Sequence, residues 1–392
     1  MYTFLLALIY LAFISLGLPD SLLGAGWPVM YAELGVPISF MGIISMIISG
    51  CTIISSMLSD RMTRKFGTRG VTVASVFLTA FSLIGFSMSE RFFVLAILSV
   101  PYGLGAGTID AALNNYVALH YSSRHMSWLH CFWGVGAVIS PFVMSHALVH
   151  SNWNAGYRTV GFIQLGIAAV LTVTLPVWKK AGTRSVPVKQ KALGLSGALK
   201  IRGVPFLLLG FFAYCAAEAT GMYWASTYLV RVTGLGEETA AGFGSLIYIG
   251  LTVGRFIAGF FSNRLGDRRM IIIGASAMAA GILTMLIPGS TAAVAGLTVT
   301  GFGCAPIYPS IIHSTPSNFG PENSGAIIGI QMASAYMGST FMPPLFGVLG
   351  SGITFSILPL FLAFFTVLTV TMTELTFRIT SKNRSIPAAN KG

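Results

Sequence analysis

The sequence predicts an all-α polytopic membrane protein with twelve transmembrane helices in two pseudo-symmetric six-helix bundles. Of its 392 residues, 54% are hydrophobic and only 9% are charged, whereas a soluble domain carries about 25% charged residues. Apolar runs of about 20 residues, the length that crosses a bilayer, recur along the whole chain. Two basic turns, Asp60–Arg69 and Asn263–Arg269, stand about half the chain apart. That spacing predicts an internal repeat of six spans.

Polar or basic breaks separate six expected spans in the first half of the chain. These spans are 3–31, 37–59, 70–89, 92–121, 127–150 and 159–178. The following stretch, residues 179–202, holds seven Lys and Arg residues and no acid. It is therefore expected to be a basic cytoplasmic linker between an N-terminal bundle, residues 1–178, and a C-terminal bundle, residues 203–379.

The second half repeats the pattern, with two expected spans at 203–230 and 239–262. Residues 270–321 hold no Asp, Glu, Lys or Arg, and Pro288–Gly289 divides them into two spans. Residues 323–373 are also free of charge, and Gly350–Gly352 divides them into the last two. The polar tail, residues 380–392, is expected to be disordered and cytoplasmic.

The distribution of Lys and Arg predicts the orientation. With the N-terminus inside, 19 of the 23 Lys and Arg residues fall in inner loops, three fall outside, and Arg255 lies within a span. Positive charge marks cytoplasmic loops, so both termini are expected in the cytoplasm of a multi-pass cell (inner) membrane protein. Topology and anionic lipid then explain the net charge of +12, and no nucleic-acid partner is expected.

The first basic turn resembles a known signature. Ser56-x-x-x-Asp60-Arg61-x-x-Arg64-Lys65 is similar to the helix 2–3 signature of the major facilitator superfamily, although Ser56 and Thr63 stand where that family usually has glycine. The second copy, Gly259-x-x-x-Asn263-Arg264-x-Gly266, keeps both glycines and has Asn in place of Asp. The resemblance extends over the whole chain and implies a carrier that works by alternating access.

Three shorter motifs resemble the fucose/galactose/glucose–proton symporters, the fucose permease branch. They are Gly17-Leu-Pro-Asp20, Asp110-Ala-Ala-Leu-Asn114 and Gly254-Arg255-Phe256. They match the branch where it keeps two membrane carboxylates and a helix 8 arginine, except that Asp110 replaces a usual Glu. The resemblance implies proton-coupled uptake of a small polar solute, a monosaccharide first of all.

Asp20, Asp110 and Glu218 are the acids expected well inside spans. An acid in hydrocarbon must face a cavity, pair with a cation or be protonated, which makes each a candidate proton-coupling residue. The alternative is a buried structural pair, for instance with Arg255. Three acids against one arginine leave at least one acid uncompensated, which favours protonation.

The expected solute site combines groups that bind hydroxyls with aromatic faces that cover a sugar ring. The candidates are Asp20, Trp27, Asn114, Asn115, His130, Trp133, Glu218, Trp224, Tyr228, Arg255 and Gln331. For the aromatic residues the alternative is packing or a place in the interfacial belt, and for the amides it is a bond to another helix. The two basic turns are expected to supply a conformational latch: Asp60, Arg61, Arg64, Asn263 and Arg264.

Two alternatives to proton symport stay open. Gly134-Val-Gly136-Ala-Val-Ile-Ser140-Pro141 partly matches the antiporter signature, which would fit efflux of drugs or metabolites. Carboxylates also serve sodium, so a sodium-coupled symporter is the second. The expected partners are the solute, the coupling ion and membrane lipids, with the protein as a monomer. No P-loop, nucleophile elbow or metal cluster is apparent, so neither an enzyme nor a cofactor or metal site is expected.

Overall fold

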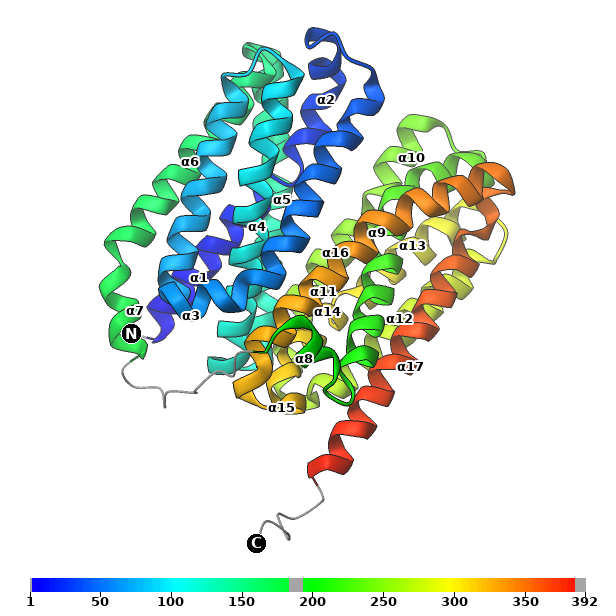
Figure 1. Cartoon of the computed structure of the whole chain (residues 1–392). Helices are drawn as coiled ribbons and strands as arrows, with labels where there is room; N and C mark the ends of the chain where they lie inside the picture. The colour runs from blue at the N-terminus through cyan, green and yellow to red at the C-terminus, as the bar shows by residue number, and fades with distance from the viewer. Residues whose placement is uncertain (1, 183–192, 385–392) are drawn as a thin grey trace, which may run out of the picture. The chain divides into compact units, whose positions relative to one another are not determined.

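A computed structural model describes residues 2–182 and 193–384. Within these ranges the chain forms two compact units (Figure 1). The first unit runs to Tyr116 and resumes at Leu129, and the second comprises Val117–Trp128 and the residues from Leu193 onward. Every regular element in the described ranges is helical, as the sequence predicts.

The first unit contains α1 to α7, with the α4–α5 turn assigned to the second unit. The bounds are α1 Tyr2–Gly17, α2 Leu22–Glu33, η1 Ile38–Phe40, α3 Met41–Ser87, α4 Phe92–His120, α5 Ser123–His150, α6 Trp153–Val173 and α7 Leu175–Gly182. The second unit contains α8 Leu195–Leu199, α9 Val204–Thr233, α10 Glu237–Gly244, α11 Leu246–Leu265, α12 Asp267–Met285, α13 Ser290–Cys304, α14 Ile307–His313, α15 Thr315–Phe319, α16 Pro321–Gly352, η2 Phe355–Ile357 and α17 Leu358–Arg384.

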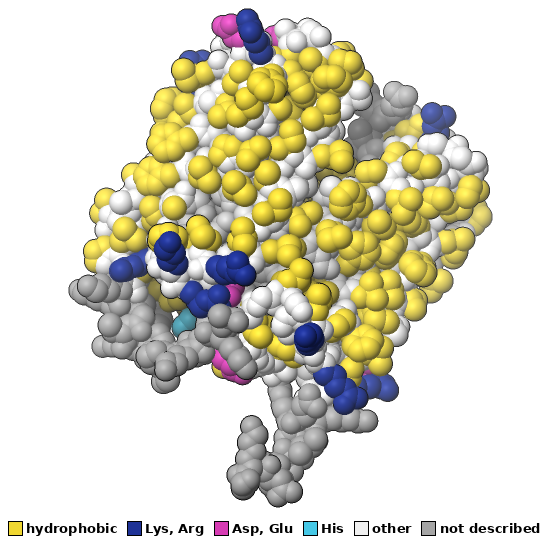
Figure 2. Space-filling view, viewed as in Figure 1, with side chains coloured by type: hydrophobic (Ala, Val, Ile, Leu, Met, Phe, Trp, Pro, Cys, Tyr) yellow, Lys and Arg dark blue, Asp and Glu magenta, His cyan; other side chains and the backbone are white. Residues whose placement is uncertain are grey.

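Ten helical stretches are long and apolar enough to cross a membrane in the described part of the chain. One of them, Ile38–Ser87, has 50 residues and bends at Gly67, so it contains two spans. α16 is outside the ten, yet its 32 residues have the length to cross. When the bent stretch is counted as two spans and α16 is added, the described helices agree with the twelve predicted spans. In Figure 2 hydrophobic side chains cover most of the visible surface, as lipid contact requires.

Two predicted turns are largely helical, which corrects the sequence interpretation. α3 continues through Asp60–Phe66, and only Gly67 leaves the helical region, with φ 72° and ψ 154°. In the second copy Gly266 separates α11 from α12 with φ 75° and ψ 159°. Thr63 occupies the position of Gly266, and a threonine rarely adopts a positive φ. The first copy therefore bends one helical turn later, at a glycine.

The two segments predicted as linker and tail are partly helical. Residues 179–182 complete α7, α8 lies at 195–199, and residues 380–384 extend α17. The remaining parts of these predictions, residues 183–192 and 385–392, lie outside the described residues.

α4 packs tightly against α3 because α4 carries small residues at the contact. A Cβ on Gly103 would lie 2.4 Å from the carbonyl oxygen of Ile48, and one on Gly107 would lie 2.2 Å from that of Thr52. Without side chains at these positions, the backbones of the two helices can approach closely. Hydroxyls on α3 then reach α4 carbonyls: Thr52 and Ser55 donate to Gly103, Ser56 to Gly107 and Ser59 to Thr108.

Candidate functional site

The first predicted span is broken where its acid lies. α1 ends at Gly17 and α2 begins at Leu22, with Pro19 and Asp20 in the gap. Pro19 has no N–H, so the carbonyl of Ser15 loses its helical donor. Gln164 Nε2 donates to this carbonyl at 2.5 Å. The break is thus held by a side chain from α6, and Asp20 is exposed.

A close crossing of α1 and α5 places Trp133 beside Asp20. A Cβ on Gly17 would lie 2.0 Å from the carbonyl oxygen of Trp133, and one on Gly136 would lie 2.3 Å from that of Ile14. At this crossing the indole Nε1–H of Trp133 donates to Asp20 Oδ2 at 2.8 Å. Gly136, part of the antiporter-like motif, therefore has a packing role in this protein.

The second acid of this unit is buried. Asp110 is 4% exposed, and Asn114 Nδ2, one helical turn on, donates to Asp110 Oδ1 at 2.8 Å. With the amide in this orientation, Asn114 Oδ1 accepts from His130 Nε2–H at 3.1 Å. Asp110, Asn114 and His130 thus form a buried chain from α4 to α5. Asn115 is also buried.

The two carboxylates of the first unit are electrostatically coupled, since the charge of Asp110 acts on Asp20. Tyr102, from α4, interacts with Asp20 as well. Like charges that act on one another disfavour double ionisation in a medium of low dielectric constant. Ionisation of one of the two acids therefore makes ionisation of the other less favourable.

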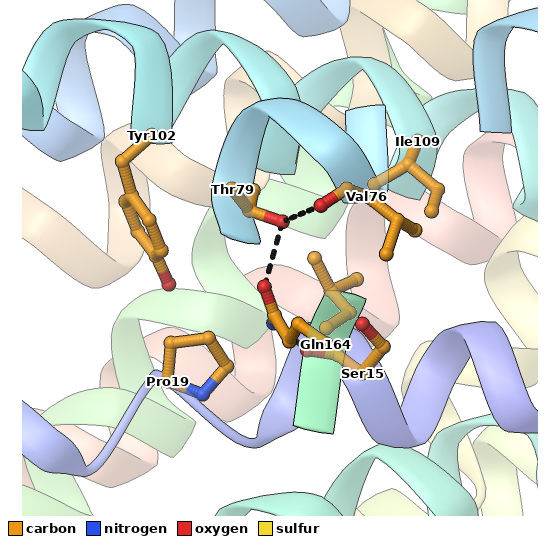
Figure 3. Close-up of a pocket in the computed structure, with 8 residues that line it drawn as sticks. Ser15, Pro19, Val76, Thr79, Tyr102, Ile109 and Gln164 are labelled. Carbon is orange, nitrogen blue, oxygen red and sulfur yellow. Dashed lines mark hydrogen bonds between the residues drawn. The ribbon is translucent and has the colours of Figure 1, made fainter. Parts of the chain in front are cut away.

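A small pocket lies behind the helix break (Figure 3). Its lining includes Pro19, Thr79, Tyr102 and Gln164, and it has room for about one water molecule. Thr79 Oγ1 donates to Gln164 Oε1 at 2.9 Å, so Gln164 joins three elements at this point. The pocket is too small for a monosaccharide.

A second polar cluster lies in the second unit and is built on an ion pair. Arg255 Nη2, on α11, donates to Glu218 Oε1, on α9, at 2.9 Å. The Tyr214 hydroxyl, one turn before Glu218, lies 2.8 Å from the same oxygen. The Arg255 guanidinium also lies over the ring of Tyr308, 5.9 Å from its centroid. The pair between Arg255 and an acid, considered from the sequence, is thus present for Glu218.

Three of the aromatic candidates bond to backbone carbonyls of their own unit. Trp27 Nε1 donates to Ile38 at 2.7 Å, Trp224 Nε1 to Pro343 at 2.8 Å, and the Tyr228 hydroxyl to Met285 at 3.1 Å. These bonds connect helices or satisfy carbonyls at helix ends. Gln331 is fully buried and accepts from Thr315 Oγ1 at 2.9 Å.

The residues of the predicted latch have contacts within their own units. Asp60 is 6% exposed and pairs with Arg64, while its Oδ1 has no hydrogen-bond partner among the described residues. In the second copy Asn263 Oδ1 accepts the backbone N–H of Arg124 at 3.0 Å. Arg61 and Arg264 are exposed.

Sequence reasoning missed several members of both clusters. Tyr214 precedes Glu218 by four residues and shares its helix face, a spacing that could have identified it. Pro19 directly precedes Asp20, and a helix breaker beside an intramembrane acid is a comparable signal. Tyr102 and Tyr308 come from other elements, and only the tertiary structure brings them to the acids.

Two curated relatives illustrate the range of similar sequences. The chain is 24% identical over 283 residues to "Bypass of stop codon protein 6" of Saccharomyces cerevisiae, covering 64% of this chain and 56% of the yeast protein. It is 20% identical over 302 residues to the glucose/mannose transporter GlcP of Bacillus subtilis, covering 74% of each chain. The chain thus spans little more than half the length of the yeast relative.

Solved structures share the fold over nearly the whole chain. A crystal structure of the transporter FucP in the outward conformation superposes with a TM-score of 0.78 at 15% identity, over 95% of this chain and 98% of FucP. The human organic anion transporter MFSD10 gives 0.76 at 13% identity, over 95% and 98%. The proton:xylose symporter XylE gives 0.74 at 14% identity, over 96% and 95%. Such identities show the fold alone.

The family itself is shown by sequence. The profile of the Major Facilitator Superfamily matches residues 9–257 and 238–392, and the structure has the all-helical fold of that family. This multi-pass membrane protein belongs to the Major Facilitator Superfamily.

Proposed function

We propose that this protein is a secondary active transporter that carries a small polar solute, in the first instance a monosaccharide, into the cell together with protons. One observation carries the proposal: the exposed carboxylate of Asp20 in the broken first span, coupled to the buried carboxylate of Asp110. Broken spans are where carriers bind solutes and coupling ions. Intramembrane acids are, by default, candidates for ion pathways.

The roles of the residues follow from their exposure and partners. Asp20 and Trp133 offer a carboxylate and an indole N–H to solute hydroxyls, at the point where the helix break leaves Asp20 exposed. Asn114 and His130 are buried and hydrogen-bonded to one another, so they position Asp110 rather than contact the solute. Asp110 then serves as the proton-coupling acid of the first unit, and Glu218 is the proton-coupling acid of the second unit.

The choice of solute and ion also draws on similar proteins. FucP is a fucose:proton symporter of E. coli, XylE is a proton:xylose symporter, and GlcP is a glucose/mannose transporter. The protein is expected in the cell membrane, with both termini cytoplasmic, acting as a monomer and without enzymatic activity.

The second candidate is a carrier of organic anions or other metabolites, working as an antiporter. The buried Arg255 favours it, because a solute carboxylate could take the place of Glu218 at the guanidinium. MFSD10, which shares the fold, is an organic anion transporter.

Uptake into proteoliposomes tests both candidates. The purified protein is assayed with labelled monosaccharides and labelled organic anions, under an inward proton gradient, an inward sodium gradient or none. Proton-driven accumulation of a sugar supports the proposal. Accumulation driven by the sodium gradient would identify sodium, and not the proton, as the coupling ion. Accumulation of anions alone, or solute exit driven by inward protons, would favour the second candidate.

A further inference from the structure

The Tyr214 hydroxyl has one proton and two neighbouring acceptors. It lies 2.8 Å from Glu218 Oε1 and 2.9 Å from the carbonyl oxygen of Cys304. A backbone carbonyl only accepts. If Tyr214 donates to Cys304, the short contact with Glu218 is a hydrogen bond only when Glu218 carries a proton. If Tyr214 instead donates to an ionised Glu218, no proton lies between the Tyr214 hydroxyl oxygen and the carbonyl oxygen of Cys304.

The Cys304 carbonyl lies at a break in a spanning helix. α13 ends at Cys304, α14 begins at Ile307, and Pro306 lies between them. Because α13 ends at Cys304, its last carbonyls, that of Cys304 included, have no donor within the helix. The Tyr214 hydroxyl is a donor from α9 for one of these carbonyls.

The other side of the same break contacts the same ion pair. Tyr308, on α14, lies under the guanidinium of Arg255, which binds Glu218. Glu218 is thus connected to Cys304 through Tyr214 and to Tyr308 through Arg255. A change of charge on Glu218 acts on both sides of the break at once.

We propose that Tyr214 is a positioning residue that conveys the protonation state of Glu218 to the helix break at Ala305–Pro306. Resting on the proposed proton coupling, this inference assigns Glu218 a conformational role. When Glu218 takes up a proton, its acid O–H donates to Tyr214, and the tyrosine proton turns to Cys304 and caps the break. When the proton leaves, the tyrosine proton turns back to the carboxylate and the cap is lost.

The described titratable groups around Glu218 come from several elements. Tyr214 lies on α9, Arg255 and Tyr248 on α11, and Cys304 on α13. Arg255 stays charged and favours the carboxylate, while tyrosine and cysteine side chains are neutral at physiological pH. The pH response near the break is therefore expected to come from Glu218.

Hydrogen–deuterium exchange of the full chain in nanodiscs tests this inference without any solute. Exchange of peptides covering residues 303–312 is measured at pH 6 and pH 8 and corrected for intrinsic rates. Loss of one hydrogen bond should change the equilibrium constant for local opening of this segment about threefold to tenfold. Wild type should exchange more slowly by this factor at pH 6. Glu218→Gln, whose amide donates to Tyr214 as the acid does, should exchange slowly at both pH values.

Tyr214→Phe should exchange fast at both pH values, because it cannot cap the carbonyl. The matched control is Tyr228→Phe on the same helix, which loses a hydroxyl bond to the Met285 carbonyl and should keep the wild-type pH response. A wild-type pH response in Tyr214→Phe, or in Glu218→Gln, overturns the inference. If Tyr214→Phe does not fold, the Glu218→Gln comparison decides. Because no solute is added, the result is independent of the uptake assay.

Discussion

At the scale of single residues, the carboxylates are set in different surroundings. Asp20 is exposed at a helix break, where it meets the indole N–H of Trp133 and Tyr102, whereas Asp110 is buried and held by an amide that bonds a histidine. Glu218 is paired with a permanent cation. Carboxylates in such different environments are expected to differ in the pH at which they take up a proton.

The bond from Trp133 to Asp20 should contribute to solute affinity. Trp133→Phe keeps an aromatic face but removes the N–H that orients the carboxylate. Because a hydrogen bond to a charged group contributes roughly 1.5–3 kcal/mol, we expect about a tenfold or larger rise in the Kd of the transported sugar, measured by binding to purified protein. Trp27→Phe, whose N–H bonds to a carbonyl instead, should leave the Kd unchanged. Equal effects of both variants would argue against a solute role for Trp133.

At the scale of helices, close packing between α3 and α4 positions Asp110. The hydroxyls of α3 and the glycines of α4 hold α4 in the register that brings Asp110 to its place. Ser56 replaces a signature glycine, and Gly107 on the opposite helix supplies the space.

Gly107→Ala should destabilise the first unit. The added Cβ would lie 2.2 Å from the carbonyl oxygen of Thr52, and relieving such overpacking costs about 1–3 kcal/mol. Gly166→Ala is the control, because nothing lies within 4 Å of its Cβ. Thermal unfolding in detergent should show a lower midpoint for Gly107→Ala alone. An unchanged midpoint would contradict the packing described for α3 and α4.

The basic segment Asp60–Arg69, which bends at Gly67, should act as the conformational latch. The buried Oδ1 of Asp60 has no hydrogen-bond partner among the described residues. A second conformation of the protein could supply that partner. Asp60→Asn should therefore slow sugar uptake several-fold while the Kd stays within about twofold, since Asp60 is not assigned to the solute site. Flux and equilibrium binding are measured on the same preparation. A large loss of binding would refute the latch.

At the scale of the whole molecule, the sequence predicted the helical class, the number of spans and the family. Charge-free apolar runs and basic turns are properties of local sequence, and they suffice for these features. The interruption at Gly17–Leu22 and the helical continuation to Phe66 were not predicted. Whether a proline breaks a span depends on which neighbouring side chain satisfies the freed carbonyl, as Gln164 does for Ser15.

The orientation of the chain is the next prediction. The excess of Lys and Arg in alternate loops predicts that both termini and the linker are cytoplasmic. Reporter fusions at Lys189 and Gly392 should both report a cytoplasmic location, with a fusion in the loop at Arg91 as the external control. An external signal at either of the first two sites would contradict the twelve-span topology.

The most direct test of proton-coupled uptake is the behaviour of Asp110→Asn in proteoliposomes. The amide keeps the size of the carboxylate and its bond to Asn114, but it cannot carry a proton from one side of the membrane to the other. We expect the variant to lose accumulation driven by a proton gradient and to retain counterflow, in which solute exchanges for solute. Accumulation at the wild-type level, with substrate-induced proton movement intact, would contradict the coupling role of Asp110.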